Sequence, residues 1–221
     1  MKYLFFDIEC ADGGKATICS FGYVIADMDF NILDHDDIIM NPEGRFYLTG
    51  RAGRPDVNLA YPMEYFKKAP NFKAFHSRIK ELVENEEYYV VGHSVRDDVT
   101  YLNKACARYK LEPFKFKFFD TQKMFKEITG EKKQKSLENA LLAMEVNEFF
   151  ISHRSDEDAR ATMMLLEALL RKTNMSFEAY INSTDRCTGY TENGKSVWDY
   201  IPPESESKRL RENKMKGRSE E

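Results

Sequence analysis

The order of apolar and polar positions predicts strands in the first forty residues, followed by alternating helices and strands. Three segments rich in β-branched and aromatic residues are separated by Gly, Asp and Asn, which indicates an antiparallel meander over 2–9, 17–27 and 31–40. Apolar residues recur at helical spacing farther along, which predicts helices over 71–85, 97–110, 136–145 and 155–173. A buried strand is expected at 88–94 and a fifth strand at 116–122. The pattern predicts an α/β fold with a mixed five-stranded sheet flanked by helices.

Two segments depart from this alternation. Residues 41–70 carry Pro, Gly and Arg without a sustained period, which predicts a long excursion with one short helix. Residues 202–221 are charged and poor in apolar side chains, which is typical of a solvated tail. With 221 residues and 42% hydrophobic content, the rest of the chain suits one compact domain, expected over 1–201.

Composition limits the binding partners and the cellular compartment that we expect for this domain. The formal net charge of −4 provides no general basic field, so any contact with nucleic acid has to be local. The four cysteines are widely spaced and form no CxxC pair, which favours a reducing compartment, with the cytoplasm as the expected location. The apolar run at the N-terminus is short and ends at Asp7, so we expect neither a signal peptide nor a membrane-spanning helix.

The first strand ends on two acids, Asp7 and Glu9, in the segment "FFDIEC". Residues two apart on a strand point to the same face, so both carboxylates project together. Two buried anions repel each other unless a hard cation such as Mg²⁺ or Mn²⁺ lies between their oxygens. Taken alone, a solvated strand end explains the pair more often than a metal site does.

Two further acids lie at the starts of predicted helices. In "VVGHSVRDDVTYL" an acid follows a buried strand, where a helix cap and a metal ligand are both open interpretations. In "HRSDEDARATMMLL", Asp158 begins an apolar face, so its carboxylate points inward and requires a cation or a donor. Asp156 and Glu157 are explained as acids of the first helical turn. His153, considered alone, is an ordinary surface or cap residue.

The three segments "FFDIE", "GHSVRDD" and "HRSDEDA" occur in one order on a matching pattern of strands and helices. In this combination the chain resembles the histidine-type branch of the DEDD exonucleases, DEDDh, over residues 2–172. That branch includes the proofreading subunits of bacterial replicative polymerases, ribonuclease T and oligoribonuclease. The resemblance implies a ribonuclease H-like fold and a 3′ to 5′ exonuclease that releases nucleoside 5′-monophosphates.

The resemblance also implies roles for individual residues. In the second segment the family's aspartate lies five residues after the histidine and four before the leucine, so His93 and Leu102 select Asp98 over Asp97. His153 corresponds to the general base. Two Mg²⁺ or Mn²⁺ ions in a two-metal hydrolysis are then held by four carboxylates, those of Asp7, Glu9, Asp98 and Asp158.

Recognition residues are expected in the long excursion, where Arg45, Tyr47, Arg51 and Arg54 belong to a mixture of basic and aromatic side chains. Such a mixture contacts phosphates and stacks on unpaired bases, although aromatic residues that pack on the domain explain it equally well. The predicted partner is single-stranded nucleic acid with a free 3′ end, DNA or RNA. The resemblance further implies a homodimer or a polymerase or repair partner, and no membrane is expected.

A protein of this fold can also serve as a non-catalytic adaptor that binds a nucleic acid or a polymerase. The complete acidic set together with His153 argues against that alternative, because a binding module has no use for such a cluster.

Overall fold

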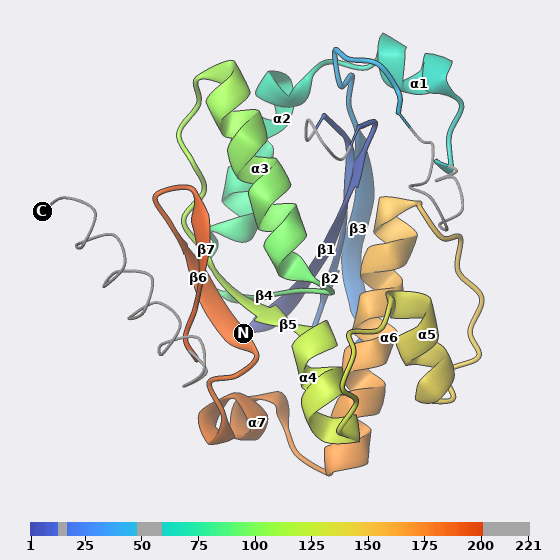
Figure 1. The fold of residues 1–221 in the computed structure, drawn as a ribbon, viewed down its shortest axis with the longest axis vertical. Helices are drawn as coiled ribbons and strands as arrows, with labels where there is room; N and C mark the ends of the chain where they lie inside the picture. The colour runs from blue at the N-terminus through green and yellow to red at the C-terminus, as the bar shows by residue number, and fades with distance from the viewer. Residues whose placement is uncertain (13–16, 48–58, 201–221) are drawn as a thin grey trace, which may run out of the picture.

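One mixed β-sheet runs through the computed structural model, which describes residues 1–12, 17–47 and 59–200 (Figure 1). The sheet order in this part of the chain is β3-β2-β1-β4-β5-β6-β7. Its strands are β1 (Lys2–Cys10), β2 (Ile18–Ala26), β3 (Ile32–Ile39), β4 (Tyr88–Gly92), β5 (Lys117–Asp120), β6 (Thr188–Glu192) and β7 (Lys195–Trp198). β1 pairs antiparallel with β2 and parallel with β4, so the predicted meander and mixed sheet are confirmed.

The helices cover both faces of the sheet. They are α1 (Met63–Lys68), α2 (Phe72–Val83), α3 (Val95–Tyr109), α4 (Thr121–Thr129), α5 (Leu137–Ala143), α6 (Ser155–Thr173) and α7 (Phe177–Ser183). Side chains of α4, α5, α6 and α7 pack with one face of β1, and those of α2 and α3 pack with the other. Because side chains alternate along a strand, Tyr3 and Phe5 face α6, whereas Leu4 and Phe6 face α2 and α3.

The prediction of five strands was too low, because β6 and β7 extend the sheet to seven strands in the described residues. The two strands form a hairpin whose turn contains Asn193 and Gly194, both with positive φ, of 48° and 72°. An Asn-Gly pair between short strands is a strong hairpin signal, so this element was readable from the sequence. The helices α4 and α7 were also not predicted.

In the residues of the long excursion that the structure describes, there is one short helix, α1, as predicted. Gly13 and Gly14, which separate the first two predicted strands, and the expected tail at 202–221 lie outside the described residues. No described helix combines the length and the apolar composition needed to cross a lipid bilayer.

Candidate active site

Two acids of β1 lie on the face that α6 covers. The alternation that buries Tyr3 and Phe5 against α6 continues to Asp7 and Glu9, so both carboxylates project from that same face. The two acids at the end of β1 therefore lie where the covering helix, α6, begins.

α6 begins directly over β2, beside these acids. Asp7 pairs with Gly22 across the β1–β2 ladder, and a Cβ at Gly22 would lie 1.9 Å from the carbonyl carbon of Ser155. Any larger residue at this position would therefore displace the first turn of α6. A glycine inside a strand often marks such a close approach of another backbone. The space left by the missing side chain of Gly22 allows α6 to approach the sheet, and this places Asp158 over the end of β1.

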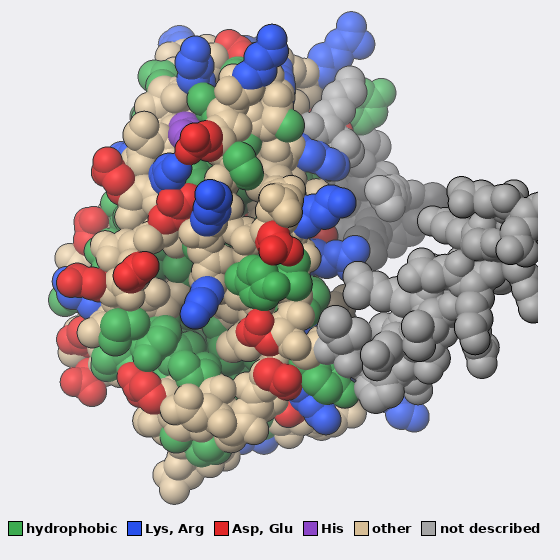
Figure 2. Space-filling model, turned by 90° about the vertical axis from the view of Figure 1, so that its left-hand side faces the viewer, with side chains coloured by type: hydrophobic (Ala, Val, Ile, Leu, Met, Phe, Trp, Pro, Cys, Tyr) green, Lys and Arg blue, Asp and Glu red, His purple; other side chains and the backbone are tan. Residues whose placement is uncertain are grey.

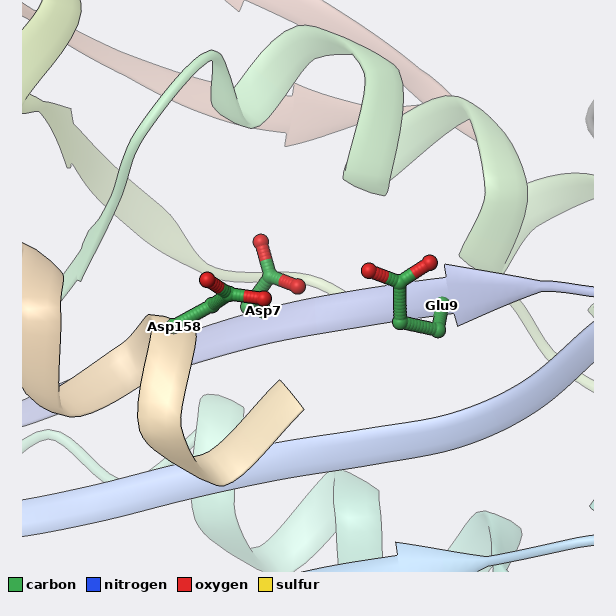
Figure 3. Close-up of side chains that lie close together, drawn as sticks. All are labelled: Asp7, Glu9 and Asp158. Carbon is green, nitrogen blue, oxygen red and sulfur yellow. The ribbon is translucent and has the colours of Figure 1, made fainter. Parts of the chain in front are cut away.

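The result is a group of three carboxylates from two elements. Asp7, Glu9 and Asp158 each place one oxygen within 4.8 Å of the other two. Figure 3 shows the carboxylates of Asp7 and Asp158 close together, with Glu9 farther toward the end of β1. The structure thus assembles acids that are separated by about 150 positions in the sequence, as residue numbers 7, 9 and 158 indicate.

Asp98 approaches this group from the opposite layer of helices. It lies in the first turn of α3 and is 6% exposed, whereas the neighbouring Asp97 is exposed. Of the charges around Asp7, the Asp98 carboxylate raises the pKa of Asp7 the most. Asp98 is nevertheless outside the group whose oxygens approach within 4.8 Å. The structure therefore brings three of the four predicted ligands together and places the fourth beside them.

His153 contacts two of the three clustered acids. It lies in the loop before α6 with a left-handed φ of 63°. Its backbone N–H donates to Asp158 Oδ2 at 2.9 Å, and its ring Nδ1 lies 3.0 Å from Glu9 Oε1. The side chain is 47% exposed, so the ring reaches solvent as well as the acids. The imidazole is thus oriented by a carboxylate at the mouth of the site.

Burial changes the acidity of the cluster. Loss of solvation and then the neighbouring carboxylates raise the pKa of Asp7 and of Asp98 well above the usual range. The same causes, burial first and Glu9 second, raise the pKa of Asp158 to about 7. The hydrogen bond to Glu9 also raises the pKa of His153, but here the reason is that it stabilises the charged form, the imidazolium.

This donor set fits a divalent cation. Its members offer carboxylate oxygens and no sulfur, which is the ligand type that Mg²⁺ and Mn²⁺ prefer. Mutual repulsion of buried carboxylates costs free energy that a bound cation would offset. The residues of the cluster therefore suit the metal ions expected from the sequence.

The four predicted recognition residues divide into two pairs. Arg45 and Tyr47 are exposed, and the backbone N–H of Tyr47 donates to the carbonyl of Ala11, just beyond β1. Arg51 and Arg54 lie outside the described residues.

A second aromatic group lies nearer to His153. The Ala60 N–H donates to the His153 carbonyl at 3.3 Å, and the neighbouring Tyr61 stacks on Tyr65 with a centroid separation of 5.7 Å. The Arg154 guanidinium lies over the Tyr61 ring, 5.8 Å from its centroid. The excursion therefore contacts the histidine through its backbone at Ala60, and the aromatic stack begins at the next residue.

Sequence reasoning missed Gly22. It also missed the hydrogen bonds that Ser155 makes with Ser20 and with Asp37. Gly22 carried a signal, since glycine inside an apolar strand indicates close approach of a backbone or ligand. Ser155 is the first residue of α6, and the cap residue before it, Arg154, makes no side-chain cap bond. The Ser155 hydroxyl lies 2.7 Å from Asp37 Oδ1.

Comparison with known structures shows where this fold recurs. A 3′-exonuclease described with the 3′-end of a histone mRNA stem-loop superposes with a TM-score of 0.65 at 14% identity, covering 91% of this chain and 92% of that chain. The nuclease domain of 3′hExo, a DEDDh family member bound to rAMP, gives a TM-score of 0.60 at 13% identity, covering 79% and 92%. Exonuclease I of E. coli in complex with a dA16 oligonucleotide gives 0.61 at 14% identity, covering 82% of this chain and 43% of that longer chain.

These likenesses confirm the predicted ribonuclease H-like fold. Among curated protein sequences, none matches this chain significantly. Residues 63–169 match the family model described as "DNA polymerase III subunit epsilon-like, C-terminal domain", of the DEDDh type. That range contains Asp98, His153 and Asp158, and the β1 acids precede it. The family model over residues 63–169 and the shared fold agree that this chain is similar to DEDDh exonucleases.

Proposed function

We propose that this protein is a metal-dependent 3′ to 5′ exonuclease that hydrolyses single-stranded nucleic acid and releases nucleoside 5′-monophosphates. The observation that carries the proposal is the convergence of Asp7, Glu9 and Asp158, with the ring of His153 in contact with Glu9. A buried acid cluster with an adjacent half-exposed histidine has the groups that phosphodiester hydrolysis requires.

Asp7, Glu9, Asp98 and Asp158 would hold two Mg²⁺ or Mn²⁺ ions. When bound, such ions activate a water molecule and stabilise the charge on the leaving 3′ oxygen. The protein contributes the placement of the carboxylates, with Asp7 and Glu9 fixed on a strand and Asp158 on a helix held against it. Rigid elements of this kind keep the ligands in position during turnover.

His153 would accept the proton of the attacking water. A carboxylate can only accept a hydrogen bond, so the contact with Glu9 requires the proton on Nδ1 of His153. In the neutral ring Nε2 then carries the lone pair, which is the form a general base needs. Glu9 therefore sets the tautomer in addition to its role as a ligand.

Substrate binding would depend on a few side chains near the active site rather than on a general positive charge. Figure 2 shows acidic and basic side chains intermixed on the face it presents, which agrees with the net charge of −4. The stack of Tyr61 and Tyr65 beside His153 offers a surface for unpaired bases. Arg45, Tyr47, Arg51 and Arg54 are proposed to contact the nucleic acid as well.

The wider assignments rest on the sequence. We propose an exonuclease domain over residues 1–201, with 202–221 as a separate tail. A homodimer, or a polymerase or repair partner, and a cytoplasmic location remain predictions.

The test is an assay on 5′-labelled single-stranded DNA and RNA of one sequence, with Mn²⁺, with Mg²⁺ and with EDTA. We expect a ladder that shortens from the 3′ end with metal and stays intact with EDTA. Asp98→Asn should abolish the ladder, while the matched variant Asp97→Asn, which changes the exposed neighbour, should retain it. Intact strands at high protein concentration in every condition would reject the exonuclease and favour an adaptor.

A further inference from the structure

A row of three residues crosses the first three strands beneath α6. Gly22 on β2 pairs with Asp7 on β1 and with Asp37 on β3. Residues directly opposite each other in an antiparallel ladder share a face, so Asp7 and Asp37 flank the gap at Gly22. The backbone of Ser155 and Asp156 fills this gap. The first turn of α6 therefore lies between one acid of the cluster and one acid outside it.

A buried hydrogen-bond chain holds this turn on the side away from the cluster. The Ser155 side chain is fully buried, with its Oγ 2.7 Å from Asp37 Oδ1 and 2.8 Å from Ser20 Oγ. A hydroxyl carries one proton and a carboxylate only accepts, so Ser155 donates to Asp37 and accepts from Ser20. One helix residue thus bonds to side chains of two strands.

This contact lies one helical turn from the cluster. Ser155 precedes Asp158 by three residues in the same helix, and the Asp158 carboxylate accepts from the backbone N–H of His153. The cap residue Arg154 makes no side-chain cap bond to α6. The bond from Ser155 to Asp37 therefore ties the start of the helix, and with it Asp158 and His153, to the sheet.

We propose that Asp37, acting through Ser155, is a positioning residue for phosphodiester hydrolysis. The inference rests on the proposed function and deepens it. The Asp37 carboxylate accepts hydrogen bonds from Ser155 and from Tyr61. Its effect on the cluster is carried by the place of the first turn of α6, to which Ser155 belongs. Misplacement of a reacting group by about 1 Å can cost about 100-fold in rate, which sets the size of the expected effect.

The test compares Asp37→Ala, Asp37→Asn and Ser155→Ala with the matched control Asp36→Ala. Asp36 is the adjacent residue of β3, points to the opposite face and pairs with Arg78 at 2.7 Å. We expect Asp37→Ala and Ser155→Ala to lower kcat about 10- to 100-fold with KM changed by less than about threefold, and to weaken Mn²⁺ binding measured by calorimetry. Asp37→Asn retains an oxygen that accepts from Ser155, so it should restore most of kcat. Asp36→Ala should keep the wild-type kcat.

Hydrogen exchange provides a readout that does not depend on activity. In Asp37→Ala the backbone amides of residues 154–159 should exchange faster than in the wild type, while those of the last turn of α6 should be unchanged. Wild-type kcat, Mn²⁺ affinity and exchange in Asp37→Ala would overturn the inference, and so would an Asp37→Asn variant as impaired as Asp37→Ala. If the wild-type protein shortens no strand, the proposed function fails, and the exchange at 154–159 then shows only whether Asp37 holds the first turn of α6.

Discussion

Gly22 of β2 and Ser155 of α6 meet backbone to backbone, because a Cβ at Gly22 would lie 1.9 Å from the carbonyl carbon of Ser155. Gly22 also pairs with Asp7 in the neighbouring strand. A close approach of helix and sheet therefore lies beside the acid cluster, and the absence of a side chain at Gly22 permits it.

Gly22→Ala should push the first turn of α6 away from the sheet. We expect a loss of about 1–3 kcal/mol in the free energy of unfolding, as is usual for overpacking, together with weaker Mn²⁺ binding. Gly44→Ala is the matched control, because its Cβ would meet the end of the Thr17 side chain at 3.2 Å rather than backbone. Urea unfolding measures both variants. Equal stability of Gly22→Ala and the wild type would show that the helix can shift without cost.

Asp7→Ala and His153→Ala should separate metal binding from proton transfer. Asp7→Ala should abolish turnover and tight Mn²⁺ binding, since it removes one of the three carboxylates of the cluster. His153→Ala should keep the metals and lower kcat by about 10²–10⁴-fold, the usual contribution of a general base. Calorimetry with Mn²⁺ and single-turnover rates measure the two effects, with the exposed His35→Ala as control. Equal loss of metal in both variants would contradict the assigned roles.

The raised pKa of Asp158, about 7, predicts how stability depends on pH without metal. The folded protein keeps this proton up to about pH 7, while the unfolded chain releases it near the ordinary pKa of about 4. Stability from this group is therefore present at low pH and is lost as pH rises through about 7. In EDTA, Asp158→Asn should stabilise the protein more at pH 8 than at pH 5. Thermal melts at both pH values measure the difference, and an equal effect would show that Asp158 titrates normally.

Arg51→Ala and Arg54→Ala test whether the excursion contacts the strand. If these side chains neutralise phosphates, the variants should bind single-stranded nucleic acid more weakly, and the slope of log K against log salt should decrease by about 0.7 for each lost contact. Arg171→Ala is the control, because this exposed arginine lies in the last turn of α6 and pairs with Glu167. Fluorescence anisotropy over a range of salt concentrations gives both numbers. Unchanged affinity and slope would assign the two arginines a structural role.

Much of the fold could be predicted because strand and helix periods are local properties of the chain. Alternation in β1 placed Asp7 and Glu9 on one face, and helical spacing in α6 pointed Asp158 inward, before any tertiary contact was known. The hairpin of β6 and β7 was missed although Asn193 and Gly194 signal it, since its strands are short and carry few apolar residues.

The sequence by itself determined which residue types lie on which face of each element, and in what order the acids follow one another. It could not determine which element packs on a given face, because that depends on the fit of surfaces far apart in the chain. Only the tertiary structure therefore revealed the contact of His153 with Glu9, the clearance at Gly22 and the bond from Ser155 to Asp37. Each joins residues more than a hundred positions apart, where no local period operates.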